Sequence, residues 1–161
     1  DADQVVTIHQ SQVLFDLDMA RVNVSAWAVG VAQGAFEKAL RYSTERVQFG
    51  QPIAKFQFTQ WKVAEMASKI ETARLLMYKA AWVRDYKKEE RSLVSKLAAM
   101  SKAYAAKVAI DVTKEAMQIH GAYGTLPEFH LMRYLRDALE TISAGGTNEI
   151  MRVIIGREIT K

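Results

Sequence analysis

The sequence predicts an all-α fold: an up-and-down bundle of three long helices followed by short helices near the C-terminus. Half of the 161 residues are hydrophobic, which is enough for a substantial core. Only two prolines and eight glycines interrupt the chain, so long helices are favoured over a β-sandwich with many turns. Apolar residues recur at helical spacing over three stretches, each of which spans about 40 Å as a helix.

The first helix is predicted from about Leu17 to about Glu45, where apolar residues recur every three or four positions. Asp16 or Asp18 is expected to cap its N-terminus. Gly30 and Gly34 have low helix propensity, and together with neighbouring alanines they predict a narrow surface for close helix packing. The apolar positions of this helix are Val24, Trp27, Ala28, Val31, Ala35 and Tyr42.

The remaining elements follow from the breaks in the pattern. Gly50 and Pro52 end the first helix and predict an ordered loop at FGQPIAKFQ. Two long helices are then expected from about Thr59 to Lys87 and from about Leu93 to His120, a short one from about Phe129 to Asp137, and a last one capped by Thr147. Trp27, Trp61 and Trp82 occupy helical positions typical of a core or an interface, and Arg136 with Asp137 predicts an ion pair.

Composition excludes several kinds of site. The chain has no cysteine, so disulfides, a thiol nucleophile and cysteine-bound metals are absent. His9, His120 and His130 are far apart in sequence, and no metal site is expected. The net charge of +4 is spread along the chain, unlike the clustered basic stripe of a nucleic-acid-binding protein. No apolar run reaches the length of a membrane span, and the first ten residues do not resemble a signal peptide.

Three polar breaks contain glycine and adjoin a helix end: RVQFG, QIHGAYG and AGGTNE. Glycines let a ligand approach the backbone, and the free N–H groups of a helix start suit phosphate oxygens. Arg46 in the first break is suited to a bidentate phosphate contact. From spacing alone, simple turns between helices are the favoured explanation of these breaks.

Four ordered motifs resemble the C-terminal helical domain of the acyl-CoA dehydrogenase family. They are LDMARVNVSAWAVGVAQGAFEKALRYSTERVQFGQPIAKFQ, KVAEMASKIETARLL, AMQIHGAYG and RYLRDALETISAGGTNEIMRVIIGREI. The resemblance covers residues 15–161. It implies a protein with an N-terminal helical domain, a middle β-domain and this bundle, so that residues 1–14 are a linker or a remnant of the preceding β-domain.

The resemblance also implies a function in fatty-acid metabolism. Members of the family bind FAD and an acyl-CoA thioester; a base removes the α-proton and a hydride moves from the β-carbon to the flavin. They form homo-oligomers, commonly homotetramers, in which the flavin loops of this domain reach the FAD of a neighbouring subunit. A dimer or tetramer is therefore expected, with electron-transfer flavoprotein as a further partner. Cytoplasm is the expected location, or the mitochondrial matrix for a eukaryotic source.

The matching motif positions give the expected site residues. The cofactor contacts implied by the resemblance are Arg46, Gln48, Phe49, Phe56, Gln57, Gln118, Ile119, His120, Gly121, Ala122, Thr147 and Glu149. The implied substrate contacts are Asp18, Arg21 and Gly146. Ala122 stands where the family usually has a second glycine, and its methyl group is expected to alter the approach of the backbone to the ligand.

The chain departs from the family at the catalytic base. Gly145 occupies the usual glutamate position, and Ala20 occupies the alternative position used by isovaleryl and long-chain members. Neither residue can remove a proton, and general-base catalysis contributes about 10²–10⁴-fold. Asp16, about one helical turn before Ala20, is a candidate substitute. The isolated chain is expected to be inactive. Two alternatives stay open: a non-catalytic assembly subunit that completes a partner's flavin site, and a flavin-dependent reductase or monooxygenase.

Overall fold

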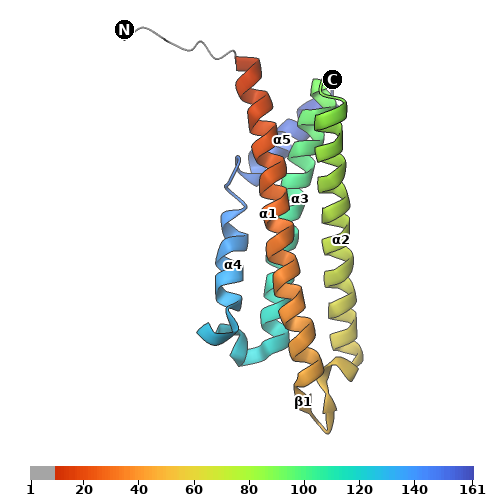
Figure 1. The fold of residues 1–161 in the computed structure, drawn as a ribbon, viewed down its shortest axis with the longest axis vertical. Coiled ribbons are helices and arrows are strands. Elements are labelled where there is room, and N and C mark those ends of the chain that lie inside the picture. Colours follow the sequence, from red (N-terminus) through yellow and green to blue (C-terminus); the bar gives the residue numbers. More distant parts are fainter. Residues whose placement is uncertain (1–9) are drawn as a thin grey trace, which may run out of the picture.

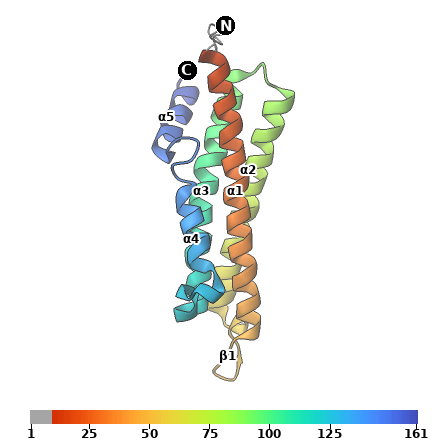
Figure 2. The same cartoon turned by 60° about the vertical axis from the view of Figure 1, so that its left-hand side comes forward.

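The computed structural model describes residues 10–161, which form a helical bundle. Three long helices lie side by side: α1 (Gln10–Glu45), α2 (Gln57–Tyr86) and α3 (Arg91–His120) (Figure 1). Two short helices, α4 (Leu131–Glu140) and α5 (Asn148–Ile159), follow one another along one side of the bundle (Figure 2). The predicted fold class is confirmed. Within residues 10–161, no helix is both long and apolar enough to cross a bilayer.

Short connections join the long helices. Between α1 and α2 lies a hairpin of β1 (Val47–Gln48) and β2 (Gln51–Pro52), followed by a 3₁₀ turn at Ile53–Lys55. Residues 87–90 connect α2 to α3. Two 3₁₀ segments, Gly121–Thr125 and Pro127–Phe129, lead from α3 into α4. The hairpin and the 3₁₀ segments therefore lie at the same end of the bundle, at the bottom of Figure 1.

Helix α3 is the centre of the core because it contacts all four other α-helices. Most of its buried side chains are alanine or valine, which let neighbouring helices approach closely. These residues are Val94, Leu97, Ala98, Ala99, Ser101, Lys102, Ala105, Ala106, Val108, Ala109, Val112, Thr113, Ala116 and His120. Helices α4 and α5 both pack on α3 and form the fourth layer of the bundle.

The two glycines of α1 have different surroundings. A Cβ atom on Gly34 would lie 2.7 Å from Cε1 of Tyr134 on α4, so the close packing predicted there is confirmed. A Cβ atom on Gly30 would meet no atom within 4 Å, and Gly30 is exposed. The prediction of close packing at Gly30 is therefore wrong, because this position faces away from the neighbouring helices.

The predicted start of the first helix is also wrong. Helix α1 begins at Gln10, seven residues before Leu17, since no glycine or proline interrupts this stretch. Asp16 and Asp18 thus lie inside the helix and do not cap it. Residues 10–14, predicted as part of the linker, belong to α1, whereas the rest of that segment and His9 lie outside the described residues.

The tryptophans are not core residues. Trp27, Trp61 and Trp82 are 40%, 57% and 52% exposed, so this part of the prediction is wrong. Each lies on the outer face of its helix, where an apolar side chain at helical spacing is compatible with contact to another chain. Their assignment to an interface stays a prediction. Trp61 stacks on Phe58 of the same helix, at 6.0 Å between ring centroids.

The C-terminal elements match their predictions closely. Thr147 caps α5, and its side-chain oxygen accepts a hydrogen bond from the backbone N–H of Ile150 at 3.4 Å. Helix α4 extends three residues beyond the predicted end at Asp137. The Nε of Arg136 lies 3.8 Å from Oδ1 of Asp137, a local and exposed ion pair that confirms the prediction.

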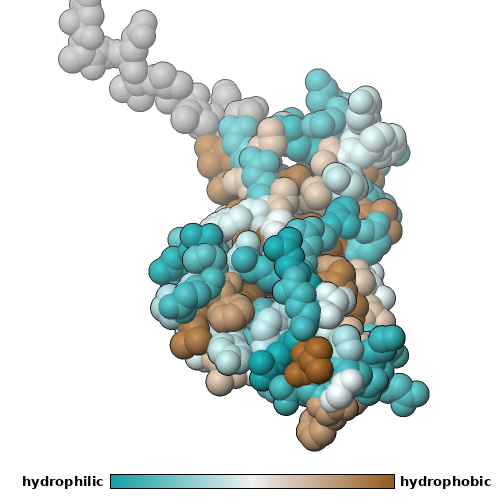
Figure 3. Space-filling view, turned by 60° about the horizontal axis from the view of Figure 1, so that its bottom comes forward, coloured by the Kyte–Doolittle hydropathy of each residue, from teal (hydrophilic) through white to brown (hydrophobic). Residues whose placement is uncertain are grey.

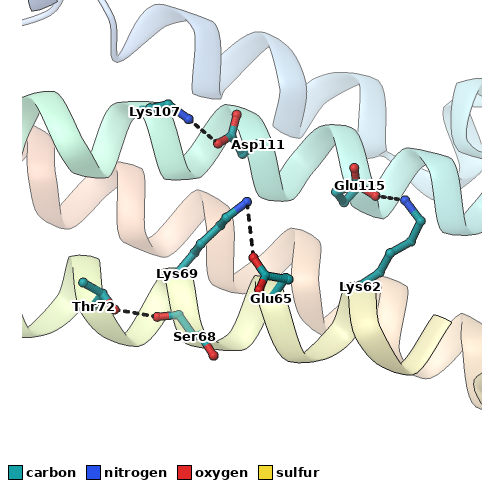
Figure 4. A network of polar contacts seen from close by, with 8 residues as sticks. All are labelled: Lys62, Glu65, Ser68, Lys69, Thr72, Lys107, Asp111 and Glu115. Carbon is teal, nitrogen blue, oxygen red and sulfur yellow. Dashed lines mark hydrogen bonds and ion pairs between the residues drawn. The ribbon is translucent and has the colours of Figure 1, made fainter. Parts of the chain in front are cut away.

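Polar contacts follow the outer faces of α2 and α3 (Figure 4). Lys69 pairs with Glu65 along α2, and Lys107 pairs with Asp111 along α3. Lys62 of α2 instead reaches across to Glu115 of α3. This cross-helix ion pair lies toward the end of the bundle that carries the hairpin.

Candidate functional site

The predicted site residues lie at the two opposite ends of the bundle. We call residues 46–62 and 114–125 the hairpin end, and residues 16–25, 92–102 and 141–151 the loop end. The 24 residues of α1 that separate Arg21 from Glu45 span about 36 Å. Two of the three polar breaks belong to the hairpin end, and the third belongs to the loop end.

The hairpin presents Phe49 to solvent. Val47 pairs with Pro52 and Gln48 with Gln51, which leaves Phe49 and Gly50 as a two-residue turn. Both turn residues have positive φ, 51° and 78°, as a type I′ turn requires. A bulky residue rarely adopts this conformation. The Phe49 side chain is nevertheless 93% exposed, so the strained backbone displays an aromatic ring that no described residue covers.

A groove of about 620 Å³ lies beside this hairpin. It brings together residues from three separate segments of the predicted cofactor site: Gln48, Phe49, Phe56, Gln118 and Ile119. Figure 3, with this end turned forward, shows hydrophobic residues at the surface among hydrophilic ones. The predicted cofactor contacts of α1–α2 and of α3 are therefore parts of one surface.

Sequence reasoning missed several residues of this groove. Ile53, Phe58, Thr59, Lys62, Lys114 and Glu115 also line it. Lys62 lies 4.9 Å above the ring centroid of Phe58 and forms the ion pair with Glu115. The i, i+4 spacing of Phe58 and Lys62 at a helix start was a usable signal. Because Glu115 offsets the charge of Lys62, Lys114 gives the groove a net positive charge that favours an anionic ligand.

The side chains of two predicted contacts point elsewhere. The guanidinium carbon of Arg46 lies 5.6 Å from the ring centroid of Tyr123, a cation–π contact at the rim of the hairpin end. The His120 ring is buried and stacks on Tyr42 at 4.2 Å. Its Nδ1 lies 2.8 Å from the Ala116 carbonyl, and burial lowers the pKa of His120. His120 is therefore a buried, neutral residue that does not line the groove.

The residues after His120 have an open backbone. Gly121 has φ 58°, and a Cβ atom there would meet nothing within 4 Å. Ala122 has no positive φ and is exposed, so its methyl group causes no strain in this turn. The close approach occurs instead at Gly124, where a Cβ atom would lie 2.8 Å from the Met117 carbonyl oxygen. Gln57, the first residue of α2, is exposed nearby.

At the loop end, Asp18 and Arg21 form a buried ion pair. Nη1 of Arg21 donates to Oδ1 of Asp18 at 2.6 Å, and both residues are less than 10% exposed. Burial raises the pKa of Asp18, and the hydrogen bond from Arg21 opposes this shift. Nε of Arg21 also points to the Gly145 carbonyl at 3.4 Å. Two predicted substrate contacts thus lie directly against the loop after α4.

The two base positions of the family converge at the loop end. A Cβ atom on Gly145 would lie 3.8 Å from Cα of Arg21, the residue that follows Ala20. Gly145 and Gly146 have φ values of 67° and 102°, which favour glycine. Asp16 is exposed on α1, one turn before Ala20. Asp18 is connected to this loop through Arg21.

The last predicted cofactor contacts begin α5. Thr147 is its cap, and Glu149 lies in its first turn, where the helix dipole favours a negative charge. Hydrogen bonds from its own backbone N–H and from Thr147 lower the pKa of Glu149, which is exposed and therefore ionised at neutral pH. Thr147 and Glu149 lie far from the hairpin groove of the same chain.

A buried lysine, which sequence reasoning missed, holds the loop before α5. Nζ of Lys102 donates to the carbonyl oxygens of Ile142 and Gly146 and to Oδ1 of Asn148. No signal in the local sequence marked it, because its acceptors lie 40 to 46 residues further along the chain. Among residues 10–161, no group of three or more His, Asp or Glu side chains is placed to hold a metal ion.

The groove fits a flavin dinucleotide in its chemistry. Phe49, Phe56 and Phe58 offer apolar rings for a planar ring system, and Lys114 offers positive charge for a diphosphate. The amide side chains of Gln48 and Gln118 offer both donors and acceptors. The residues present therefore suit the cofactor that the motifs predict.

Comparisons with known proteins show the family of the chain. The family described as acyl-CoA dehydrogenase, C-terminal domain, matches residues 11–160. A probable acyl-CoA dehydrogenase of Bacillus subtilis is 42% identical over 150 residues, which cover 93% of this chain and 38% of that protein. The caffeyl-CoA reductase–Etf complex subunit CarC of Acetobacterium woodii is 38% identical over 151 residues, covering 94% of this chain and 39% of that protein.

A solved structure gives the same result. The structure of butyryl-CoA dehydrogenase from Megasphaera elsdenii matches with a TM-score of 0.88 and 39% identity, over 93% of this chain and 38% of that one. The chain thus spans less than two fifths of the length of these relatives. From its motifs, its fold and these matches, the chain belongs to the acyl-CoA dehydrogenase family and corresponds to the family's C-terminal domain.

Proposed function

We propose that this chain is the C-terminal domain of an FAD-dependent enzyme that catalyses α,β-dehydrogenation of an acyl-CoA thioester. The observation that carries the proposal is the hairpin groove, in which residues from two motifs far apart in sequence line one surface. Turns that only connected helices would not need an exposed aromatic ring on a strained backbone. The bound FAD would accept the hydride from the β-carbon of the substrate.

At the hairpin end, the chain's own residues bind and orient the cofactor. The Phe49 and Phe56 rings, whose centroids are 6.3 Å apart, cover apolar parts of the flavin nucleotide. Lys114 attracts its negative charges, and Arg46 at the rim adds another cation. Gln48 and Gln118 fix its orientation by hydrogen bonds.

At the loop end, the chain binds the acyl-CoA. The buried ion pair of Asp18 with Arg21 supports the loop at Gly145, and Gly146 lets the thioester approach the backbone. Thr147 and Glu149 contact the flavin from this side. Since Gly145 and Ala20 carry no carboxyl group, the chain orients the substrate here but supplies no base at either family position.

The separation of the two ends supports an oligomer. One FAD cannot contact two surfaces about 36 Å apart along α1; the hairpin end therefore serves the flavin of a neighbouring subunit. Helix α2 also exposes an apolar face suited to such an interface, formed by Leu75, Tyr78, Trp82 and Tyr86. A homodimer or homotetramer is the expected assembly.

Electron-transfer flavoprotein is the proposed electron acceptor. The named association of the Acetobacterium woodii relative with Etf supports this partner. A cytoplasmic location, or the mitochondrial matrix in a eukaryote, is compatible with the same family membership.

The absence of a carboxylate at Gly145 and Ala20 favours a second candidate function. In this alternative the domain belongs to a non-catalytic assembly subunit, whose hairpin end completes the flavin site of a partner. A reductase that works on the same scaffold is related to the first proposal, because it transfers the hydride in the opposite direction.

An anaerobic titration of the native protein distinguishes these functions. We expect the purified protein to contain FAD, and acyl-CoA thioesters to bleach its absorbance as the flavin is reduced. An assembly subunit would contain no flavin alone but would raise the flavin content of its partner. A reductase would instead show oxidation of its reduced flavin by an enoyl-CoA. A flavin-containing protein that responds to no acyl-CoA or enoyl-CoA would overturn the proposal.

A further inference from the structure

Lys102 is a fully buried cation in the middle of the apolar helix α3. Its ammonium group has three N–H donors, and three oxygen atoms accept them: the Ile142 carbonyl at 2.6 Å, the Gly146 carbonyl at 2.7 Å and Asn148 Oδ1 at 2.9 Å. A buried lysine is costly unless its charge is fully hydrogen-bonded. All three acceptors belong to the segment that runs from the end of α4 to the start of α5.

The other backbone hydrogen bonds of this segment are local, from the N–H groups of residues 141–144 and 146 to carbonyl groups three or four residues earlier. The segment contains no helix between residues 141 and 147, and its two glycines adopt left-handed backbone conformations. A Cβ atom on Gly146 would lie 3.0 Å from Cε of Met151, so the turn packs tightly against α5. The contact from Arg21 to the Gly145 carbonyl, at 3.4 Å, is long for a hydrogen bond. The three bonds from Lys102 are therefore its strongest links to the long helices.

The charges around Lys102 are few. Arg21 of α1 and Glu149 of α5 are the ionisable groups that interact with it electrostatically. Glu149 attracts the ammonium group and Arg21 repels it, and burial lowers its pKa to about 8. The ammonium form, which has three donors, is thus still the main one at neutral pH.

We propose that Lys102 is the positioning residue of the acyl-CoA site, which fixes the loop of residues 141–147 in its binding conformation through Gly146 and Asn148. This role rests on the proposed function of the loop end. Lys102 touches neither substrate nor flavin, since it is buried beneath the loop. It sets the direction of the Gly146 carbonyl, and through Asn148 it sets the start of α5, where Thr147 and Glu149 lie.

The first test measures the loop itself and needs no activity. Lys102→Met keeps the length of the side chain but removes all three donors. We expect backbone amides of residues 142–149 to exchange with solvent roughly 10- to 100-fold faster in this variant of the native protein, because three carbonyl-type oxygens lose their partners. Amides of the hairpin end, residues 47–56, should keep their rates.

Two control variants separate positioning from general effects. Lys107→Met removes a lysine from the same helix that is exposed and paired with Asp111, and it should leave both segments unchanged. Met66→Ala removes a buried core side chain of α2 and destabilises the whole bundle. If Lys102→Met accelerates exchange everywhere, as Met66→Ala does, Lys102 is an ordinary stabilising residue and the proposal is wrong.

The second test measures the turnover of the acyl-CoA substrate. We expect Lys102→Met to lower kcat/KM for acyl-CoA roughly 10- to 100-fold at a temperature where it stays folded, while its flavin content is kept. Met66→Ala at the same temperature should change kcat/KM less than about 2-fold. Faster loop exchange without any loss of acyl-CoA turnover would refute the positioning role. A wild-type protein that binds no acyl-CoA would refute the proposed function alone, because the exchange result would still decide whether Lys102 fixes the loop.

Discussion

The hairpin end and the loop end carry the two halves of the predicted site, but they are built in opposite ways. At the hairpin end the functional side chains are displayed: Phe49 is 93% exposed, and Phe58 is 68% exposed. At the loop end the cations that support the loop are enclosed: Lys102 is 0% exposed and Arg21 is 6% exposed. The first end offers side chains to a ligand, and the second uses buried side chains to shape a backbone.

This difference separates binding from stability. A displayed side chain makes few contacts within the chain, so its replacement should weaken ligand binding more than it lowers the stability of the fold. A buried charge is bonded on all sides, so its replacement leaves unpaired partners and destabilises the protein. Substitutions at the two ends should therefore have opposite signatures. The following predictions test this contrast, beginning with the largest expected effect.

Gly145→Glu should give the largest change, in activity. A Cβ atom at this position would meet only ordinary contacts, at 3.6 Å or more, so the side chain fits although the φ of 67° is unfavourable for glutamate. It places a carboxylate at the usual base position beside Arg21. We expect the rate of flavin reduction by acyl-CoA to rise roughly 10²-fold. Stopped-flow absorbance of the flavin measures this rate.

Ala20→Glu is the matched variant for this test. It places a carboxylate at the family's other base position, on a regular helix without positive φ. Both variants should accelerate flavin reduction, because Gly145 and Ala20 adjoin the same turn of α1. If neither variant accelerates flavin reduction, a group outside these two positions already removes the proton. The missing carboxylates at Gly145 and Ala20 then do not limit the reaction.

Removing one partner of each end's ion pair compares the two ends directly. Arg21→Met leaves Asp18 buried without its cation and should lower the free energy of unfolding by about 3–5 kcal/mol. Lys62→Met removes the partner of Glu115, which is already partly exposed to solvent. It should lower the free energy of unfolding by about 1 kcal/mol or less. Urea unfolding of both variants measures the difference.

The pH dependence of this cost provides a control. At low pH the buried Asp18 can take up a proton and become neutral. The loss of unfolding free energy caused by Arg21→Met should therefore be smaller at pH 4 than at pH 7. The loss of unfolding free energy caused by Lys62→Met should change little between these pH values. Equal losses for the two variants at pH 7 would contradict the contrast between an enclosed and a displayed end.

Lys102 gives the loop end an alkaline pH dependence. Its pKa is about 8 in the folded chain and 10.5 as the ordinary value, so the unfolded state binds more protons between these pH values. The free energy of unfolding should therefore rise with pH from about 8 to 10.5, by about 3 kcal/mol in total from this residue. The same contribution is lost as the pH falls through 8.

Lys102→Met isolates this contribution. Subtracting the stability of the variant from that of the wild type at each pH cancels the titration of the exposed lysines and tyrosines. The difference should increase across this pH range in urea-unfolding measurements. A difference that stays constant from pH 7 to 10 would show that Lys102 keeps its ordinary pKa and is more hydrated than its burial implies.

The sequence predicted the helices well because their signal is local. Helical periodicity, scarce glycine and proline, and the Thr147 cap all act within a few residues, and α2, α3 and α5 begin within two residues of their predicted starts. The start of α1 was wrong, since the residues before Leu17 contain no feature that ends a helix. The motifs also identified five of the eleven residues that line the groove.

The buried network could not be predicted because it depends on distant residues. Lys102 reads as an exposed residue in a helix until its acceptors, 40 to 46 residues away, are brought to it by the packing of α5 on α3. The burial of His120 has the same origin, since Tyr42 and Phe129 enclose it from other elements. Periodicity alone also could not show that the motif with Thr147 belongs to the loop end and the motif with Gln118 to the hairpin end.

Phe49→Asn sharpens the contrast from the hairpin end, with the smallest effect on stability. Asn–Gly is the preferred pair for a type I′ turn, and asparagine tolerates positive φ better than phenylalanine. Because the Phe49 ring buries almost nothing, the variant should be more stable by about 0.5–1 kcal/mol in urea unfolding. It should nevertheless retain less FAD after gel filtration, since the displayed ring is lost. Phe49→Leu, which keeps an apolar side chain and the strain, should gain no stability. A Phe49→Asn variant that is destabilised would mean that this ring supports the fold, and the two ends would then be built alike.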